Sequence, residues 1–488
     1  METGEPKGEI HAPCREIIAT LKATLKAQSD QLALLQRRID QQDKRILDLE
    51  ARLNQNSRNS SKPPSSDPLS TPPRPSKPPS GRSPGGQPGH EGSTFKLVPV
   101  EEVDQVIPVK PQRCVGCGHR LSGDDPDPKR HQVTEIPPVK PIIIEYLLHR
   151  LICPKCSRAT RAELPPGVPT KMIGPALQSL IGYFSGRLHL SKRAVQEALE
   201  DLFGVSLSLG SVSAAEQEVS RALAAPVEDA HQYVQHQPSL GADETGWTQR
   251  RGRAWLWTAV TTWVTVFQIH LNRGADAARA LLGTFRGILS TDRWNAYTSY
   301  PLRRRQVCWA HLIRDFVGFT ERGRKAAKIG GPLLIEADKM FALWKRVRDG
   351  TLKRSSFTVY MTPIRQAVES LLRKGTRCGE PKTEGMCEMI LKLAPALWTF
   401  VRVEGIEPTN NASERAIRPA VLYRKGCFGT HSAEGSRFVE RILTVVTTLR
   451  QQGRNVLDYL TQACVAAMNH RKAPSLLPRR RAMTQSAA

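Results

Sequence analysis

The sequence is poor in cysteine and in long apolar runs. Its 488 residues include 10 cysteines, too few for a disulfide scaffold. No apolar run reaches the roughly 18–20 residues that a membrane-spanning helix needs. The first residues, METGEPKGEI, lack the basic-then-apolar pattern of a signal peptide. These absences exclude a secreted, membrane-spanning or collagen-like protein, and they predict a soluble, cytoplasmic chain.

Acidic residues are also scarce relative to basic ones. Asp and Glu together number 46 against 71 for Lys and Arg, which gives a net charge of +25. A surplus of this size favours a polyanionic partner, either nucleic acid or an anionic membrane surface. Because no membrane segment is expected, we predict that the partner is nucleic acid. The length predicts about two to four domains.

Residues 15–54 carry a heptad repeat. The a positions are all large and aliphatic: Ile18, Leu25, Leu32, Ile39, Ile46 and Leu53. The d positions are Leu21, Gln28, Leu35, Gln42 and Leu49. The g-to-e pairs Arg38–Asp43 and Arg45–Glu50 are typical of parallel two-stranded coils. The pattern predicts a coiled coil that makes a homodimer or a higher oligomer, in preference to one amphipathic helix of a globular domain.

The stretch 55–93 is very different in composition. Between residues 57 and 92, 24 residues are Ser, Pro or Gly, and Leu69 is the one large apolar residue. Such a segment cannot bury a core. We therefore expect 55–93 to be a disordered linker that acts as a tether.

Two Cys-x-x-Cys pairs lie in the segment 94–165, at Cys114 and Cys117 and at Cys153 and Cys156. Each pair can present two thiolates from one tight turn, and two such turns complete a tetrahedral zinc site. Gly118, just after the first pair, suits a turn that needs a positive φ. Free buried cysteines and a redox pair are the alternatives. We predict a zinc-ribbon-like module with one structural Zn²⁺.

The remaining segments are predicted to be helical or mixed. Residues 166–230 contain two short helices around a Gly-containing break, which indicates either a helix-turn-helix DNA-binding element or an ordinary helical hairpin. From 235 to 430 the pattern is α/β, with strands at 240–243, 254–260, 264–269 and 287–292 and a helical insertion at about 303–400. Residues 431–488 are expected to be helical and end in the basic tail Arg479–Arg481.

Three carboxylates stand out in the α/β segment. Asp243 and Asp292 each end a short apolar stretch, and Glu414 lies in the first turn of a predicted helix. Ligands usually bind at the carboxyl edge of an α/β sheet. Two Asp and one Glu, brought together, can hold the divalent metals Mg²⁺ or Mn²⁺, which support phosphoryl transfer without a protein nucleophile.

Each carboxylate also has an ordinary structural explanation. Asp243 could belong to a turn. Asp292 could cap a helix that begins at Arg293. Glu414 stands three residues after Asn411, in the spacing of a capping box. Taken singly, each of these explanations is favoured over a catalytic one, because caps and turns are common.

A resemblance to a known family favours the catalytic interpretation, and it rests on four motifs that occur in a fixed order. The chain contains Gly-Ala-Asp243-Glu-Thr-Gly-Trp, Ser-Thr-Asp292-Arg-Trp-Asn-Ala-Tyr, Cys308-Trp-Ala-His311 and Pro-Thr-Asn-Asn411-Ala-Ser-Glu414-Arg. Together with the linker motifs at 61–67 and 85–90, the coiled coil and the cysteine pairs, they resemble the transposases of the insertion sequence 66 family. The resemblance covers nearly the whole chain.

This resemblance implies an RNase H-like catalytic core with an Asp-Asp-Glu triad at Asp243, Asp292 and Glu414. The implied activity is that of a bacterial DNA transposase, which cuts element ends and joins them to target DNA, with accessory transposition proteins as further partners. Arg415 and Arg418 either contact phosphate or form a solvated basic face. His311 is interpreted as a helix-packing residue, although it could approach the site.

Two alternatives to the transposase remain open. One is a catalytically inactive, dimeric, zinc-containing DNA-binding protein. The other is an RNase H-fold nuclease that does not join strands. We expect any of the three to work at the nucleoid.

Overall fold

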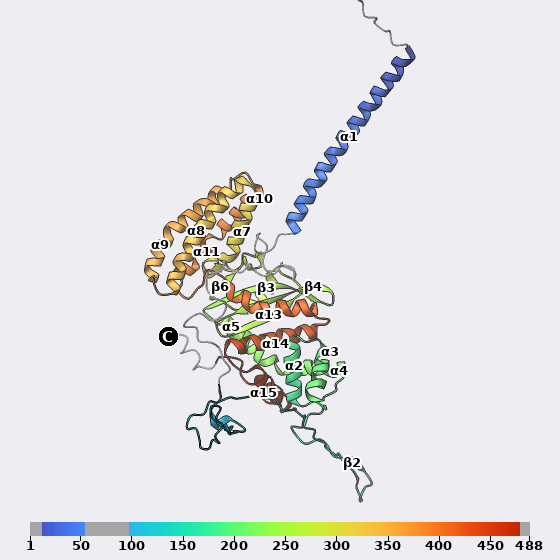
Figure 1. Ribbon diagram of the computed structural model, residues 1–488, viewed down its shortest axis with the longest axis vertical. Coiled ribbons are helices and arrows are strands. Elements are labelled where there is room, and N and C mark those ends of the chain that lie inside the picture. The colour runs from blue at the N-terminus through green and yellow to red at the C-terminus, as the bar shows by residue number, and fades with distance from the viewer. Residues whose placement is uncertain (1–11, 54–96, 479–488) are drawn as a thin grey trace, which may run out of the picture. The chain divides into compact units, whose positions relative to one another are not determined.

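The computed structural model describes residues 12–53 and 97–478 (Figure 1). They fall into two compact units, the larger with 12–53, 164–192 and 210–478 and the smaller with 97–163 and 193–209. The predicted linker 55–93, its motifs at 61–67 and 85–90, and the tail Arg479–Arg481 lie outside the described residues. None of the described helices is both long and apolar enough to cross a bilayer.

The heptad-bearing segment forms one helix, α1 (Ala12–Leu53). Its aliphatic side chains that the structure describes are exposed, with Leu25 at 63% and Leu32 at 67% of their full accessibility. Burying such a stripe requires a second helix. The helix is as predicted, and its pairing in a coiled coil stays a prediction.

The larger unit contains a five-stranded mixed sheet with the order β5-β4-β3-β6-β7. β3 pairs with β4, and β4 with β5, in antiparallel fashion, whereas β3–β6 and β6–β7 are parallel. The strands are β3 (Ser239–Gln249), β4 (Gly252–Val260), β5 (Thr265–His270), β6 (Ile288–Thr291) and β7 (Arg305–Val307). The fold class is therefore α/β, as the sequence predicts.

One strand boundary differs from the prediction. β3 does not end at Asp243 but continues to Gln249, where it pairs with Gly252 of β4. The two residues between them, Arg250 and Arg251, have φ values of 50° and 64°. This is the left-handed geometry of a two-residue hairpin turn. Because such turns usually contain Asn or Gly, two arginines gave no sequence signal for it.

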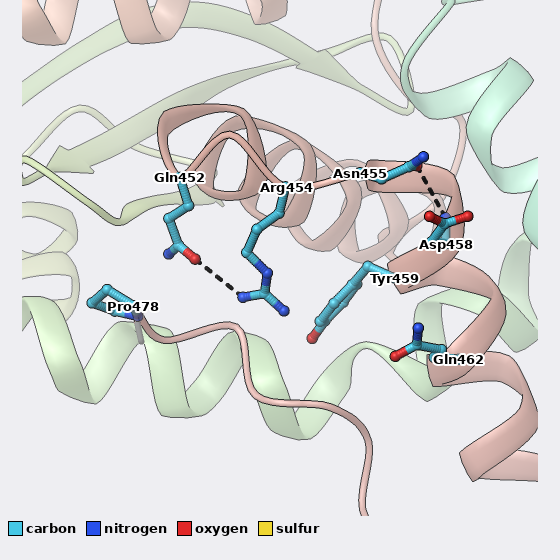
Figure 2. Close-up of a pocket in the computed structure, with 7 residues that line it drawn as sticks. All are labelled: Gln452, Arg454, Asn455, Asp458, Tyr459, Gln462 and Pro478. Atoms are coloured by element: carbon cyan, nitrogen blue, oxygen red, sulfur yellow. Dashed lines mark hydrogen bonds between the residues drawn. The ribbon is translucent and has the colours of Figure 1, made fainter. Parts of the chain in front are cut away.

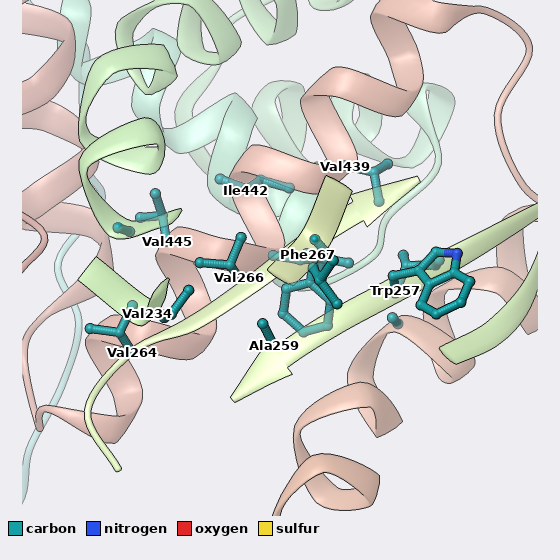
Figure 3. Close-up of a cluster of buried hydrophobic side chains, with 14 of the residues drawn as sticks. Val234, Trp257, Ala259, Val264, Val266, Phe267, Val439, Ile442 and Val445 are labelled. Carbon is teal, nitrogen blue, oxygen red and sulfur yellow. The ribbon is translucent and has the colours of Figure 1, made fainter. Parts of the chain in front are cut away.

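Helices pack against the sheet on several strands. α13 (Asn411–Cys427) contacts β3 and β4, α6 (Ala275–Leu282) contacts β4, and α5 (Ala224–Gln235) and α14 (Ala433–Gln451) contact β5. Figure 3 shows Val439, Ile442 and Val445 of α14 beside the β5 residues Val266 and Phe267. This apolar cluster is the main core of the unit.

Helix α14 also closes the edge of the sheet. The outward N–H groups of Thr265 and Phe267 on β5 donate to the hydroxyls of Thr448 and Thr444, at 3.1 and 3.0 Å. The next outward N–H, of Ile269, donates to Glu440 Oε1 at 2.6 Å. Every second residue of β5 thus donates its N–H group to a side chain of α14, and the three accepting residues are four positions apart along the helix. The edge strand is covered and cannot pair with another chain.

The predicted insertion is helical and has its own core. It contains α7 (Trp309–Glu321), α8 (Arg324–Arg348), α9 (Arg354–Gly375), α10 (Pro381–Lys392), α11 (Ala394–Leu397) and α12 (Thr399–Arg402). Leu333, Met340 and Trp344 of α8 are buried in this cluster, as their spacing predicts. Tyr360 of α9 is 51% exposed, although it follows the apolar spacing of that helix.

Further helices lie before and after the sheet. α2 (Pro175–Gly186) contacts α14 and α15 (Val456–Met468). The predicted pair of short helices is present as α3 (Lys192–Phe203) and α4 (Leu209–Ala222), with Gly204 at φ +65° between them. A DNA-binding role for this pair stays a prediction.

Apart from α3, the smaller unit has little regular structure. In it, β1 (Arg150–Ile152) pairs antiparallel with β2 (Ala159–Arg161), and a single 3₁₀ turn spans Val100–Glu102. The hairpin encloses the second Cys-x-x-Cys pair.

Candidate active site

Asp243 and Asp292 belong to neighbouring parallel strands. The pairing of β3 with β6 runs from Ser239↔Ile288 to Gly241↔Ser290. Asp243 and Asp292 each stand two residues beyond this last pair, so they lie level on the same side of the sheet, about 5 Å apart between strand axes. The structure therefore brings together two predicted site residues that are far apart in sequence.

The structure does not support a turn position for Asp243 or a helix-cap role for Asp292. Asp243 lies inside β3, paired with Thr258, and not in a turn. Its Oδ1 accepts the N–H of Glu244 at 3.0 Å. Asp292 accepts the N–H of Trp294 at 2.9 Å, which is a local turn, but no helix begins at Arg293. Both carboxylates keep an oxygen that these local bonds do not use.

Helix α13 carries Glu414 to the same strand. At its start, Asn410 Nδ2 donates to the carbonyl oxygen of Ala242 at 2.7 Å, and Ser413 Oγ donates to Asn410 Oδ1 at 2.8 Å. Asn410 is 3% exposed and Ser413 fully buried. A Cβ on Gly241 would lie 2.3 Å from Ser413 Oγ. A glycine at this place therefore lets the helix start approach the strand.

The capping-box interpretation of Glu414 is wrong. The residue that precedes the helix is Asn410, and Asn411 is already the first helical residue. The carbonyl of Asn410 accepts the N–H groups of Ser413 and Glu414. The carboxylate of Glu414 is thus not needed to satisfy the helix start.

The three carboxylates are close enough to affect one another. Burial raises the pKa of Asp243 well above its usual value, and the negative charges of Glu244, Asp292 and Glu414 raise it further. A cluster of carboxylates that repel one another is stabilised by a divalent cation. The clustered charge therefore fits a metal site formed by oxygen ligands.

The start of α7 supplies a second set of polar groups beside Glu414. His311 Nδ1 lies 3.7 Å from Glu414 Oε1, and Arg314 Nη2 lies 3.9 Å from the same oxygen. Glu414 Oε1 and His311 Nδ1 are both buried and have no hydrogen-bond partner. Burial, aided by Arg314, lowers the pKa of His311 to about 4. His311 therefore lies close to the candidate site, as in the alternative to a purely packing role that the sequence left open.

Comparison with known proteins identifies the chain. The model of the Transposase IS66 family matches residues 171–437, which include Asp243, Asp292, His311 and Glu414. The chain belongs to this family. A family of unknown function, DUF6444, matches residues 12–96, a range that includes the whole of α1.

Two curated relatives of this IS66-family protein come from Sinorhizobium fredii (strain NBRC 101917 / NGR234). The uncharacterized protein y4qI is 27% identical over 235 residues, which is 43% of each chain. The uncharacterized protein y4hP is 23% identical over 419 residues, 76% of this chain and 73% of the relative. The match to the first relative spans less than half of its length.

A buried ion pair next to the carboxylates was missed by the sequence analysis. Glu244 accepts hydrogen bonds from Arg273 Nε and Nη2 at 3.0 and 2.7 Å and from the Tyr297 hydroxyl at 2.9 Å. The guanidinium of Arg273 lies over the rings of Trp255 and Trp294. Trp294 follows Asp292 by two residues, so this pair links β3 to the turn that carries Asp292. The pair of acidic residues at 243–244 was the signal available in the sequence.

Several arginines surround the site in this member of the Transposase IS66 family. Arg415 and Arg418 are exposed on α13, the helix of Glu414. Arg293 forms a two-pronged ion pair with Asp315 of α7, at 2.6 and 2.7 Å. Arg305 is fully buried and donates to the carbonyl oxygen of Asp292 at 2.8 Å. Arg293 and Arg305 therefore hold the Asp292 turn, whereas Arg415 and Arg418 are exposed to solvent.

The cysteine pairs form two similar turns. The N–H of Gly118 donates to the carbonyl of Cys114, and that of Ser157 donates to the carbonyl of Cys153. Gly118 has φ +73°, as predicted. Backbone N–H groups within each turn lower the pKa of the Cys114 and Cys153 thiols.

The two turns do not form one cluster in this structure. Within residues 12–53 and 97–478, the group of three metal-ligating side chains within 4.8 Å of one another is Cys308, His311 and Glu414. Among these described residues, neither the four predicted cysteines nor the carboxylates of Asp243, Asp292 and Glu414 form such a group. A zinc site shared by Cys114, Cys117, Cys153 and Cys156 therefore stays a prediction.

A pocket of about 360 Å³ lies elsewhere, at the connection of α14 to α15 (Figure 2). It is lined by Gln452, Arg454, Asn455, Asp458, Tyr459, Gln462 and Pro478. Its polar groups bond locally, for example Arg454 to Gln452 at 3.1 Å and the N–H of Asp458 to Asn455 at 3.2 Å. None of the three carboxylates lines it, so it has no direct part in the chemistry proposed below.

Proposed function

We propose that this protein is a metal-dependent DNA transposase that cuts at element ends and joins them to target DNA with the triad Asp243, Asp292 and Glu414. The observation that carries the proposal is the position of Asp292 and Glu414 near Asp243, whose pKa the negative charges of both raise. Two of the three carboxylates lie level on parallel strands, and the third is held by the bond from Asn410 to Ala242. The mixed sheet with these positions supports an RNase H-like core.

The residues present fit a site for Mg²⁺ or Mn²⁺. Asp243, Asp292 and Glu414 offer oxygen ligands, and Glu414 Oε1 is buried without a hydrogen-bond partner. Divalent cations held there supply charge stabilisation for the attacking and leaving oxygens of a phosphoryl transfer. The chain itself supplies no nucleophile. In cleavage, water attacks the phosphodiester and a 3′-hydroxyl leaves. In joining, that hydroxyl attacks a target phosphodiester and a target 3′-hydroxyl leaves.

The other residues position the site and the DNA. Asn410, Ser413 and Gly241 fix the distance from α13 to β3. Arg415 and Arg418 are exposed beside Glu414, where they can contact the DNA backbone without reading its sequence. The surplus of 25 positive charges supports DNA as the partner.

The other segments of the chain would assemble the protein and its DNA. We propose that α1 pairs with a second copy in a parallel coiled coil, which would bring two element ends together. The cysteine turns would bind one structural Zn²⁺, the helices α3 and α4 would add DNA contacts, and accessory transposition proteins would complete the machinery. The protein would work in the cytoplasm, at the nucleoid.

A direct assay tests the function. Purified full-length protein is incubated with labelled element-end DNA, target DNA and Mg²⁺, and the products are sized on a denaturing gel. Cut and joined products support the proposal when Asp243→Asn abolishes both and leaves DNA binding intact. Cleavage without joining would favour a nuclease of the same fold. Binding with no metal-dependent product would favour an inactive DNA-binding protein.

A further inference from the structure

Cys308, His311 and Glu414 meet at the starts of two helices. Their ligand atoms all lie within 4.8 Å of one another. His311 comes from the first turn of α7, and Glu414 from the first turn of α13. The triad chemistry proposed above uses Glu414 but gives no role to the other two residues.

The backbone around Cys308 holds this arrangement in place. The N–H of Cys308 donates to the carbonyl of Thr291, the residue before Asp292, at 2.8 Å. The Sγ atom of Cys308 accepts the N–H of Asn410 at 3.1 Å. Cys308 thus links the strand end of Asp292 to the helix start of Glu414. Its sulfur is already engaged, so we assign it a positioning role.

The contact between His311 and Glu414 is too long for a hydrogen bond. Nδ1 and Oε1 are 3.7 Å apart, and neither atom has another hydrogen-bond partner although both are buried. A hydrogen bond between them would be about 2.7–3.2 Å. By contrast, two ligand atoms each about 2.0–2.2 Å from one cation lie at most about 4.4 Å apart. The observed separation fits two ligands of one metal ion.

We propose that His311 Nδ1 and Glu414 Oε1 bind the same divalent cation, so that this centre has one nitrogen ligand beside its carboxylate oxygens. The inference rests on the proposed function, because it assigns Glu414 to a metal. It also has a chemical consequence. Mg²⁺ takes oxygen ligands, whereas imidazole favours later first-row metals. The centre therefore discriminates less strongly in favour of Mg²⁺ than a site formed by carboxylates alone.

Manganese provides a probe that does not depend on activity. Full-length protein is titrated with Mn²⁺, and the bound ion is examined by pulsed electron paramagnetic resonance for coupling to ¹⁴N. We expect the coupling of a directly bound imidazole in the wild type. It should vanish in His311→Ala and in His311→Gln, and Mn²⁺ affinity in His311→Ala should fall by at least about tenfold. Cys308→Ser, which keeps an acceptor for Asn410, should retain the coupling.

The outcomes separate this inference from the function on which it rests. In one outcome, the wild type binds Mn²⁺ without ¹⁴N coupling, and Asp243→Asn and Asp292→Asn no longer bind the ion. This result would overturn the nitrogen ligand and leave the proposed triad intact. Coupling that persists in both His311 variants, with folding verified by circular dichroism, would overturn it as well. If the wild type binds no Mn²⁺, or if the aspartate variants bind it unchanged, the metal site of the proposed function fails too.

Discussion

Asn410 donates a hydrogen bond of 2.7 Å from Nδ2 to the carbonyl oxygen of Ala242, a residue 168 positions away. The bond joins the residue before Asp243 to the residue that precedes the helix of Glu414. Because Asn410 is almost fully buried, water does not compete for the bond. Repulsion between carboxylates would drive the two elements apart, and this bond from a side-chain amide to a main-chain carbonyl holds them together.

Because the start of α13 lies so close to β3, we expect Gly241 to tolerate no larger side chain. A Cβ there would lie 2.3 Å from Ser413 Oγ and 2.7 Å from Asn410 Oδ1. We expect Gly241→Ala to destabilise the protein by about 1–3 kcal/mol, as overpacking does, and to reduce strand joining more than DNA binding. Denaturant unfolding and the joining assay measure the two effects.

A glycine in open space provides the control. Gly385 is exposed in the middle of α10, and an added Cβ would meet nothing within 4 Å. Gly385→Ala should leave activity unchanged and stabilise the protein by up to about 1 kcal/mol. If Gly241→Ala behaves like this control, the close approach has no functional importance.

The raised pKa of Asp243 predicts how stability depends on pH. The folded protein holds this proton more tightly than the unfolded chain, whose Asp titrates near about 3.9. The metal-free protein should therefore lose stability as the pH rises from about 3.9 through the raised pKa. Asp243→Asn removes this penalty, so it should be more stable than the wild type at neutral pH and equally stable in acid.

Urea unfolding in the presence of a chelator, over a range of pH, measures this difference. In the same variant, cleavage and joining should fall by about 10–100-fold or more, because a metal ligand is lost. An Asp243→Asn protein that is less stable at neutral pH and still active would show that Asp243 is a structural residue and not part of the triad.

The Glu244–Arg273 pair should be important for stability. The Glu244 side chain is 1% exposed, so Arg273→Ala leaves a buried charge without its partner. We expect a loss of about 3–5 kcal/mol, partly recovered when Glu244→Gln is added. Arg279, whose pair with Asp276 is exposed, is the matched control. Arg279→Ala should change stability by less than about 1 kcal/mol. Equal effects of the two arginine variants in thermal melting would contradict this assignment.

Association of the chain should depend on the a positions of α1. Ile39→Pro should abolish self-association in sedimentation experiments, because proline inside a helix costs about 3 kcal/mol. Arg37 occupies an outward f position in the same turn, so Arg37→Ala should associate like the wild type. A monomeric wild-type protein at high micromolar concentration would disprove the coiled coil.

The cysteine turns should bind zinc. We expect elemental analysis to find one Zn²⁺ per chain, and chelation to increase hydrogen exchange in residues 97–163, because binding and folding of such modules are coupled. Cys117→Ser should lose the metal, whereas Cys378→Ser, at a half-buried cysteine of the insertion, should retain it. Freshly purified protein without zinc would contradict the prediction.

Local patterns in the sequence were sufficient to predict several elements of the sheet and of the helical insertion. Apolar alternation predicted β4 and β5, and helical spacing predicted the buried face of α8. The spacing of apolar residues failed to predict burial at positions where burial depends on a neighbouring element. Tyr360 and Val465 follow the apolar spacing of their helices, yet both are exposed, since no other described element covers them there.

The sequence by itself determined the heptad helix, the α/β class, the order of the motifs and the three candidate carboxylates. Only the tertiary structure placed Asp243 level with Asp292, docked Glu414 through Asn410, and put His311 beside it. The physical reason is the range of the forces involved. Helix and strand preferences act between residues a few positions apart, whereas strand register and helix docking join residues about 50 to 170 positions apart through contacts that exist only after the core has formed.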